Sequence, residues 1–300
     1  MQKTKEIWHN GSFLPWEEAK VHVLTHALHY GDAVFEGIRV YETANGPAVF
    51  RLKEHLERLY YSASVLGMEI PYTLEQLTEA TVTLLSHCEL KHGYIRPLVF
   101  NGYGVMGLNP KGSPVDVIIA CWPWGKYLPH DMLDIKVSSY IRIHPRSTVA
   151  DAKISGHYVN SILAVRELQG TKYHEALFLD LDGNIAEGPG ENFFMVKDGS
   201  LITPPLGTIL AGITRGTIIQ FAKRHNIPVV ERSISLQEAQ AADEAFFTGT
   251  AAEVSPIRSI DDKEINKGEL GPISRKIRDS YAEMVQGRDP EFSHFLTLVK

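Results

Sequence analysis

A lysine surrounded by small residues is the first candidate for covalent chemistry. Lys153 stands in VADAKISGHYVNS, between Ala150 and Ala152 on one side and Ser155 and Gly156 on the other. At a junction between a loop and a helix, with no run of charges nearby, a lysine can be half-buried. Burial lowers the pKa of an ammonium group and favours the nucleophilic amine. From this window alone, a solvated surface lysine is the commoner alternative.

Two glutamates flank a Gly-Pro-Gly turn that follows an apolar strand. In AEGPGENFF they are Glu187 and Glu191. A carboxylate at such a turn can pair with a protonated ring nitrogen, which a pyridine-type cofactor needs when it accepts electrons. The alternative is a solvent-facing acidic turn, and the unusual glycine spacing leaves both interpretations open.

Two glycine-containing turns could bind a phosphate group. The first is 211–214, Ala-Gly-Ile-Thr, which opens a predicted helix; the second is 249–253, where Thr250 and Glu253 have the spacing of a capping box. N–H groups at a helix N-terminus and a threonine hydroxyl are suitable donors to an anion. Each signal alone is weak, because most such turns only cap helices and neither has a P-loop or dinucleotide fingerprint.

Two arginines could bind anionic groups. Arg58 lies on the polar side of a helix predicted over 52–66 and could add charge to a phosphate site, or pair with Glu54 as exposed arginines commonly do. Tyr94 and Arg96 share one face of the predicted strand YIRPLVF. A buried arginine needs an anionic partner, so this pair indicates either a carboxylate-binding site or a structural ion pair.

The elements that must position these residues combine hairpins with helices. Asn10-Gly11 and Asn45-Gly46 separate apolar alternating runs and predict hairpins whose turn residues both have positive φ. Thr73 begins a capping box for a second helix, and 94–100 and 115–122 are predicted as buried strands. This mixture favours an α+β fold over a doubly wound sheet.

A segment rich in proline, glycine and aromatic residues, WPWGKYLPHDML, predicts a domain boundary. We expect a small N-terminal domain over 1–126, a linker over 127–133 and a large C-terminal domain over 134–300. The second part should contain helices over 158–170, 213–226 and 271–287. Its hairpins should turn at Asp182-Gly183 and Asp198-Gly199.

Composition excludes several classes of protein. The 300 residues are 44% hydrophobic with a formal net charge of -6, which is ordinary for a globular protein and gives no basic face for nucleic acid. No apolar stretch approaches the roughly 20 residues of a membrane span, and the N-terminus has no hydrophobic signal core. Cys88 and Cys121 have no metal-ligand spacing and predict no disulfide framework. We therefore expect a cytoplasmic protein without metal.

The chain resembles the class IV aminotransferases, which have the pyridoxal-phosphate (PLP) fold type IV, along almost its whole length, and within them most closely the bacterial branched-chain group. The motifs that carry the resemblance are HALHYGDAVFEGIR, EHLERL, YIRPLVF, PWGKYL, EGPGENFF, PPLGTILAGITR and FFTGTAAEVSPIRS. The resemblance implies two α/β-type domains with the architecture of D-amino acid aminotransferase. One departure is Ile154-Ser155-Gly156-His157, where the family often has Gly-Gly or Ala-Gly after the lysine.

The resemblance also implies a role for each candidate residue. Lys153 would carry PLP as a Schiff base and move the proton, and Glu187 would face the pyridine nitrogen. The other cofactor-binding residues would be Arg58, Tyr158, Leu210, Ile213, Thr214, Gly249 and Thr250. The substrate pocket would be lined by Phe35, Tyr94, Arg96, Trp124, Tyr127 and Ala251, with Tyr30 and Leu108 from the neighbouring subunit.

The implied activity is ping-pong transfer of the amino group of leucine, isoleucine or valine to 2-oxoglutarate, by a homodimer or a hexamer. D-amino acid aminotransferases and aminodeoxychorismate lyases share the fold, but YIRP and the aromatic residues of PWGKY favour the L-branched-chain group. A silent PLP-binding protein is a further alternative, and the presence of Lys153, Glu187 and both anion-binding turns speaks against it.

Overall fold

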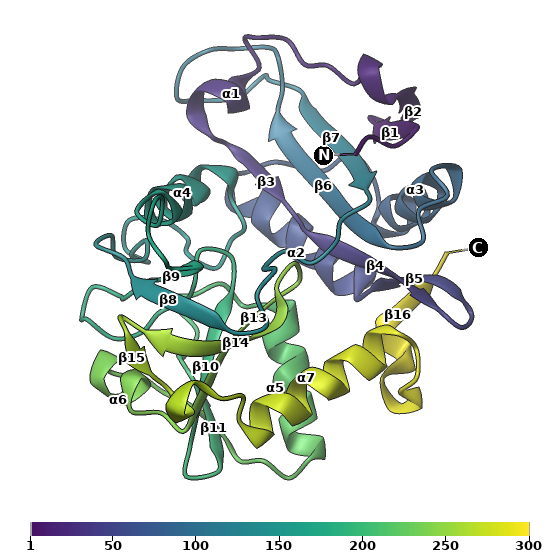
Figure 1. The fold of residues 1–300 in the computed structure, drawn as a ribbon. Coiled ribbons are helices and arrows are strands. Elements are labelled where there is room, and N and C mark those ends of the chain that lie inside the picture. The colour runs from purple at the N-terminus through teal and green to yellow at the C-terminus, as the bar shows by residue number, and fades with distance from the viewer. Residues whose placement is uncertain (1, 300) are drawn as a thin grey trace. The chain divides into compact units, whose positions relative to one another are not determined.

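The computed structural model describes residues 2–299, which form two compact units. The first unit comprises Met1–Gly125, Ala152–Gly156 and Glu283–Lys300; the second comprises Lys126–Asp151 and His157–Ala282. Each unit contains one sheet with helices packed on it (Figure 1). Both units consist of more than one stretch of the chain, whereas each domain predicted above is one continuous segment. The predicted domain boundaries remain a prediction.

The sheet of the first unit is antiparallel throughout its pairings. Its order is β16-β5-β4-β6-β7-β1-β2, and β3 pairs with β6. The strands are β1 (Glu6–His9), β2 (Ser12–Pro15), β3 (Ala33–Phe35), β4 (Ile38–Thr43), β5 (Gly46–Phe50), β6 (Gly93–Asn101), β7 (Val115–Trp122) and β16 (Leu296–Leu298).

Two long helices cover this sheet, α2 (Leu52–Val65) and α3 (Leu74–His87), and a short helix α1 (His26–Tyr30) precedes β3. Leu56, Leu59, Leu77 and Leu84 are fully buried in the core between helices and sheet. Their spacing, three residues on α2 and seven on α3, places each pair on one face of its helix. Both predicted helices and the capping box at Thr73 are confirmed, since Thr73 and Gln76 bond reciprocally.

The two predicted Asn-Gly hairpins differ in their turns. Asn10 and Gly11 both have positive φ, of 48° and 89°, as expected for a two-residue turn of type I′. At the second hairpin the prediction is wrong in detail, because Thr43 pairs with Gly46 and only Gly46 has positive φ, 102°. There the chain turns at 44–45, and Gly46 is the first residue of the returning strand.

The sheet of the second unit is mixed, with order β12-β11-β10-β13-β14-β8-β9 and β15 beside β14. Its strands are β8 (Leu133–Val137), β9 (Glu175–Leu177), β10 (Asn192–Lys197), β11 (Ser200–Thr203), β12 (Val229–Glu231), β13 (Glu244–Gly249), β14 (Glu253–Ile260) and β15 (Lys263–Glu264). The helices are α4 (Tyr158–Arg166), α5 (Ile213–Arg224), α6 (Leu236–Gln240) and α7 (Pro272–Val285).

The second unit agrees with most sequence-based expectations. The turn at Asp198-Gly199 has two positive φ angles, 50° and 75°, while at 182–183 only Gly183 does, with 82°. Helix α4 ends at Arg166, before the predicted end at 170. The α+β class is confirmed. Both cysteines are free. Within 2–299, no helix is long and apolar enough to cross a membrane, and no cluster of three or more His, Cys, Asp or Glu side chains suits a metal.

An ion pair joins two strands of the second sheet. Asp134 on β8 accepts hydrogen bonds from Arg258 and, at 2.6 Å, from Ser259 on β14. The Arg258 guanidinium lowers the pKa of Asp134 to about 2, against burial and with help from Ser259.

Replacing Asp134 with asparagine should therefore lower the free energy of unfolding at pH 7 by about 2 kcal/mol. Because the folded pKa lies below the unfolded one, this contribution is complete above pH 5 and is lost as pH falls toward 2. Urea unfolding at pH 7 and pH 3 should show the difference between wild type and Asp134→Asn shrinking by about half. A pH-independent difference would assign the loss to packing.

Candidate functional site

Lys153 lies in the segment 152–156, which the first unit incorporates like an additional strand. The Lys153 carbonyl accepts a hydrogen bond from the Phe35 amide at 3.2 Å, and the Lys153 amide donates to Ser62 Oγ at 3.0 Å. Ile154 bridges to Val34 on β3. The lysine is half-buried, with Nζ 4.9 Å from the centroid of the Phe35 ring. Its backbone is thus fixed while the amine lies against an aromatic face.

A buried carboxylate orients Arg58. Glu36 is fully buried and accepts from Arg58 Nε at 2.6 Å, Arg58 Nη2 at 2.9 Å and His55 Nδ1 at 2.7 Å. Burial acts to raise the pKa of Glu36, but Arg58 and His55 together hold it below its ordinary value. Burial lowers the pKa of His55, so this ring donates as a neutral imidazole. Arg58 is therefore not paired to Glu54 but held by a bidentate contact, which fixes the guanidinium plane.

Arg96 lies among aromatic rings on β6 and its neighbours. Its guanidinium carbon is 4.6 Å from the Phe35 centroid, 5.4 Å from Tyr94 and 5.9 Å from Trp122. Its Nε is buried and makes no hydrogen bond to the described residues, and Nη2 reaches Tyr94 Oη only at 3.5 Å. A structural ion pair is thus not its role, because a partly buried cation with an unsatisfied donor is suited to an incoming anion.

The aromatic wall depends on a glycine and on a second arginine. A Cβ at Gly37 would lie 1.8 Å from Tyr94 Oη, so only glycine leaves room for this phenol. Trp124 packs edge-on against Tyr94, with ring centroids 4.5 Å apart. Buried Arg39 donates to the carbonyl of Gly125 at 2.8 Å, which holds the segment that carries Trp124.

Three predicted pocket residues are largely exposed. Tyr30 and Leu108, in the first unit, are 42% and 88% exposed, and Tyr127, in the second, is 39% exposed. Tyr30 Oη accepts a hydrogen bond from the Gly107 amide at 3.2 Å, next to Leu108. Tyr30 and Leu108, the two residues predicted to reach the neighbouring subunit's site, are thus connected on the surface through Gly107.

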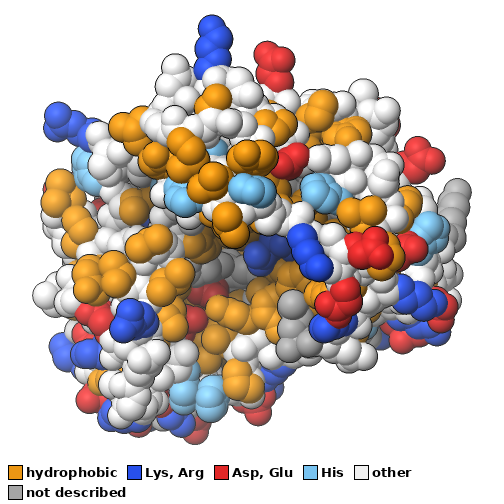
Figure 2. All heavy atoms as spheres, turned by 90° about the horizontal axis from the view of Figure 1, so that it is seen from above, with side chains coloured by type: hydrophobic (Ala, Val, Ile, Leu, Met, Phe, Trp, Pro, Cys, Tyr) orange, Lys and Arg blue, Asp and Glu red, His pale blue; other side chains and the backbone are white. Residues whose placement is uncertain are grey.

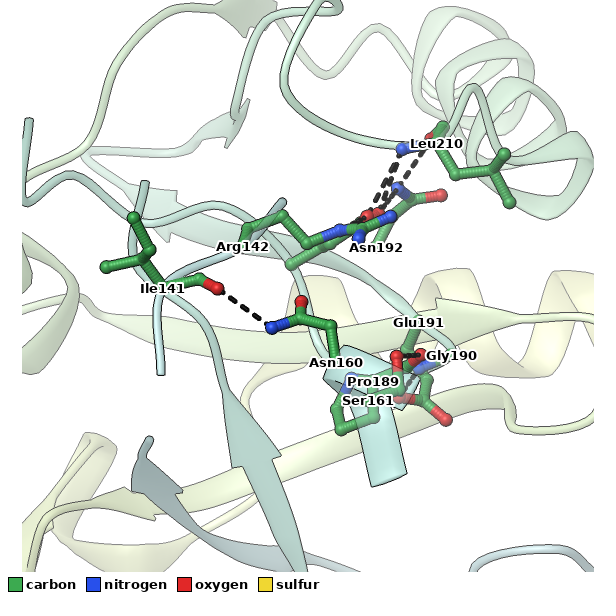
Figure 3. A network of polar contacts seen from close by, with 10 residues as sticks. Ile141, Arg142, Asn160, Ser161, Pro189, Gly190, Glu191, Asn192 and Leu210 are labelled. Atoms are coloured by element: carbon green, nitrogen blue, oxygen red, sulfur yellow. Dashed lines mark hydrogen bonds and ion pairs between the residues drawn. The ribbon is translucent and has the colours of Figure 1, made fainter. Parts of the chain in front are cut away.

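Three groups in the second unit donate hydrogen bonds to the Glu187 carboxylate; they belong to Arg142, Asn192 and Leu210, which Figure 3 labels. Arg142 Nε donates to Glu187 Oε1 at 2.5 Å, Asn192 Nδ2 to Oε2 at 3.1 Å, and the Leu210 amide to Oε2 at 3.1 Å. Glu187 is 4% exposed. Three donors, one of them cationic, favour the ionised carboxylate in a buried site. A solvent-facing acidic turn is therefore excluded.

The Gly-Pro-Gly turn itself is fixed by its neighbours. Glu191 folds back, and its Oε2 accepts from the Gly190 amide at 3.0 Å, so its carboxylate serves the turn. Ser161 on α4 donates to the Pro189 carbonyl at 2.8 Å (Figure 3). Helix α4, whose first residue is the half-buried Tyr158, is thereby anchored beside the turn.

Thr214 has an unsatisfied, buried hydroxyl at the start of a helix. It is the second residue of α5, 1% exposed, and its hydroxyl makes no hydrogen bond to the described residues. Helix α5 follows Gly212, where a Cβ would lie 1.9 Å from Asn192 Oδ1, and no side chain caps it. A buried hydroxyl at the start of a helix is the arrangement that binds phosphate.

The second predicted phosphate turn is not a helix N-terminus. Gly249 on β13 pairs with Glu253 on β14, so residues 250–252 form a hairpin turn and the predicted capping box is wrong. Glu253 has a φ of 57°, which a helix would not allow. The turn still lies next to the Gly-Pro-Gly turn, because a Cβ at Gly249 would be 3.0 Å from the Gly190 carbonyl. Thr250 is half-buried within it.

Each unit thus carries one group of the predicted residues. The first brings together Lys153, Arg58, Phe35, Tyr94, Arg96 and Trp124, and the second Tyr158, Glu187, Leu210, Ile213, Thr214, Gly249, Thr250 and Ala251. The sequence did not indicate the residues that hold these groups, among them Glu36, Arg39, Arg142 and Asn192. Glu36 and Arg58 are 22 residues apart, so no local pattern predicts their contact, and Arg142, in an irregular loop, gave no signal.

The chain is similar to known proteins along most of its length. The model of the amino-transferase class IV family matches residues 33–260. A branched-chain-amino-acid aminotransferase of Pseudomonas aeruginosa is 44% identical over 298 residues, which is 98% of this chain and 97% of that protein.

Two solved structures of a branched-chain amino acid aminotransferase from T.th. cover 100% of both chains. The complex with N-(5'-phosphopyridoxyl)-L-glutamate has a TM-score of 0.97 at 46% identity. The complex with 4-methylvaleric acid has 0.96 at 44%.

Proposed function

The chain belongs to the class IV aminotransferase family, and on that premise we propose that it transfers the amino group of branched-chain L-amino acids to 2-oxoglutarate with PLP as cofactor. The proposal rests on two groups observed in the second unit: the buried Glu187 carboxylate with its three hydrogen-bond donors, and the unsatisfied hydroxyl of Thr214. One suits a pyridinium nitrogen and the other a phosphate, and PLP contains both groups.

The residues present fit this cofactor. Glu187 would hold the ring nitrogen and Tyr158 the phenolic oxygen, while the phosphate would be held by Arg58, Leu210, Ile213, Thr214, Gly249 and Thr250. When bound, PLP supplies an aldehyde that exchanges amino groups and a ring that accepts electrons from the substrate Cα. The orphaned Thr214 hydroxyl and the oriented Arg58 guanidinium support this fit.

The chain's own groups have separate tasks in the reaction. Lys153 would hold the cofactor covalently, and its free amine would move the proton of the substrate Cα as general base and general acid. Glu187 would keep the ring nitrogen protonated, and Arg142 and Asn192 hold the Glu187 carboxylate in place by their hydrogen bonds. The lysine's fixed backbone and its place against Phe35 limit where the amine can reach.

The aromatic group around Arg96 explains how one pocket takes two kinds of substrate. Phe35, Tyr94 and Trp124 offer apolar surface to a branched chain, and Arg96 offers unsatisfied N–H donors to the side-chain carboxylate of glutamate. The solved complexes of the T.th. enzyme, one with a phosphopyridoxyl-glutamate and one with a branched aliphatic acid, support two such ligands in one fold.

A panel of L- and D-amino acids with 2-oxoglutarate as acceptor tests the proposed function. Leucine, isoleucine and valine of the L series should be the preferred donors. Preference for D-amino acids would overturn the substrate assignment, and an absence of transfer with any donor after loading with PLP would overturn the activity.

Replacing Arg96 with methionine should slow the half-reactions with glutamate and 2-oxoglutarate about ten- to a hundredfold, because a charge-assisted hydrogen bond to a buried anion is lost. The half-reaction with leucine should suffer less, since an aliphatic chain has no charge to pair. Single-turnover absorbance with each donor measures both. An equal loss for both donors would place Arg96 at the α-carboxylate that both substrates share. A selective loss for leucine would contradict the assignment of Arg96 to the side-chain carboxylate of glutamate.

We also propose that the enzyme is a homodimer. The first unit exposes a group of large apolar side chains on 21–30 and 103–108, two segments joined by a bridge between Thr25 and Tyr103; they are Val21, Val23, Leu24, Leu28, Tyr30, Tyr103, Met106 and Leu108. Figure 2 shows hydrophobic side chains and histidines gathered on one part of the face it views. Apolar patches of this kind mark association surfaces, and this one contains both residues expected in the partner's site.

Sedimentation velocity at micromolar concentration should give a dimer or a multiple of it, and Leu28→Glu, at a 63% exposed side chain, should shift the protein toward monomer. Val159→Glu, at a 57% exposed side chain on α4, is the matched control. A wild-type monomer would contradict the proposal, as would a dimer weakened by the control alone.

A further inference from the structure

His26 on α1 faces a hydrogen-bond acceptor with each of its two ring nitrogens. Nδ1 lies 2.8 Å from Asp32 Oδ2, and Nε2 lies 2.6 Å from the Gly107 carbonyl oxygen. The side chain is 2% exposed. Asn101 Nδ2 donates to the same Asp32 oxygen at 2.6 Å, so this oxygen already acts as an acceptor.

This geometry requires a proton on both nitrogens. A neutral imidazole has one N–H donor and one acceptor, whereas a carboxylate and a carbonyl oxygen only accept. A neutral ring would leave its bare nitrogen facing one of the two oxygens in a buried site. The imidazolium donates to both, and the hydrogen bond to Asp32 raises the pKa of His26 although burial opposes it.

Two side chains of α1 hydrogen-bond the backbone of Gly107: His26 binds its carbonyl and Tyr30 binds its amide. Tyr30, one helical turn after His26, has its ring centroid 4.5 Å from the imidazole and accepts from the Gly107 amide at 3.2 Å. Gly107 has a φ of 107°, a conformation other residues rarely adopt. Leu108, the next residue, is 88% exposed. Two side chains of helix α1 thus hydrogen-bond the loop 102–114 at Gly107, immediately before the exposed Leu108.

We propose that His26, as an imidazolium, is a positioning residue that locks the loop 102–114 so that Tyr30 and Leu108 are presented together to the neighbouring subunit's pocket. The inference rests on the proposed homodimer and extends it, because it names what holds the donated residues in place. Its consequence is that binding of the substrate side chain depends on the protonation state of a histidine that touches no substrate.

The groups around His26 determine its pH response. Asp32 in the turn after α1 supplies the negative charge and Tyr30 a phenol, while β6 supplies neutral Asn101 and the loop supplies the Gly107 carbonyl. His29 on the same helix bonds the Val23 carbonyl at 2.9 Å instead. Because the folded pKa of His26 is raised, the lock is complete below its ordinary value and is released as pH rises through the raised one.

Hydrogen exchange of the loop tests the lock without using activity. Peptides covering 102–114 should lose protection about tenfold or more in His26→Phe, which keeps the ring volume and removes both donors. His29→Phe, the matched control, should retain protection. Asp32→Asn should move the pH at which protection falls downward by about one to three units, since one ionised partner within hydrogen-bond distance shifts a pKa by that much.

A second readout connects the lock to the pocket. His26→Phe should raise the KM for leucine about tenfold with a smaller change in kcat, because a mispositioned apolar contact weakens side-chain binding. NMR of ring-labelled wild-type protein should show His26 as imidazolium at pH 7. A neutral ring, or unchanged loop protection in both His26→Phe and Asp32→Asn, would overturn the proposal. Changed protection with unchanged KM would refute the coupling to the pocket, and sedimentation tests the dimer separately.

Discussion

Alanine in place of Lys153 should give a protein that still binds PLP, without a covalent bond, and has lost transamination by at least about four orders of magnitude. Two functions disappear together, since the same amine holds the cofactor and moves the proton. Proton transfer by a positioned group alone contributes about 10²–10⁴ in rate, and covalent holding adds to this. The half-reaction with leucine, followed by absorbance, measures the loss.

The identity of the lysine is tested by reduction and peptide mapping. Borohydride treatment of the wild-type holoenzyme should fix a pyridoxyl label on Lys153. Lys172→Ala is the control, because this exposed lysine pairs with Asp262 at 2.6 Å, and its loss should change neither label nor rate. A label found on a different lysine would contradict the assignment of Lys153 as the lysine that carries PLP.

Glutamine in place of Glu187 should reduce turnover by about two to three orders of magnitude, the usual cost of removing one preorganised partner of a developing charge. Retention of PLP should fall much less, because the residues proposed to bind the phosphate are unchanged in this variant. A neutral amide cannot keep the ring nitrogen protonated, although it has nearly the same shape. Paired measurements of turnover and of PLP dissociation separate the two effects.

Glu191→Gln is the matched control for this experiment. Glu191 is as buried as Glu187 and stands in the same motif, but its carboxylate binds the turn. It should affect the cofactor-bound rate far less than Glu187→Gln. Proportional losses of turnover and PLP affinity in Glu187→Gln would instead make Glu187 a structural residue.

The sequence predicted best what is local in the chain. Hairpins, helices and the capping box at Thr73 follow from patterns within a few residues, and the structure confirms them. The turn at 250–252 was misjudged because Thr-x-x-Glu spacing also occurs in a hairpin loop; only the pairing of β13 with β14, which is not local, distinguishes the two.

Partners far apart in sequence were beyond prediction. Glu36 and Arg58 meet because β3 and α2 pack together. Glu187 meets Arg142 in an irregular segment, where the Arg142 amide donates to the carbonyl of Leu179, just after β9. No periodicity encodes such contacts. Arg58 was therefore expected on the polar side of its helix, whereas Glu36 draws it into the interior, where an ion pair with a buried carboxylate needs bidentate geometry.

Because the first unit combines three separate stretches of the chain, it can be completed only late in synthesis. The hydrogen bond from Phe35 to Lys153 can form only after Lys153 has been synthesised. Likewise β5 can pair with β16 only after β16, roughly 250 residues further on, has been synthesised. At a synthesis rate of about 5–20 residues per second, that interval is on the order of 10–50 s. Throughout it, β5 has an unpaired edge in a strand whose Ala48, Val49 and Phe50 are later fully buried. An open apolar edge is a template for association, so this nascent chain should depend on chaperones, and its yield should respond to translation speed more strongly than its final stability implies.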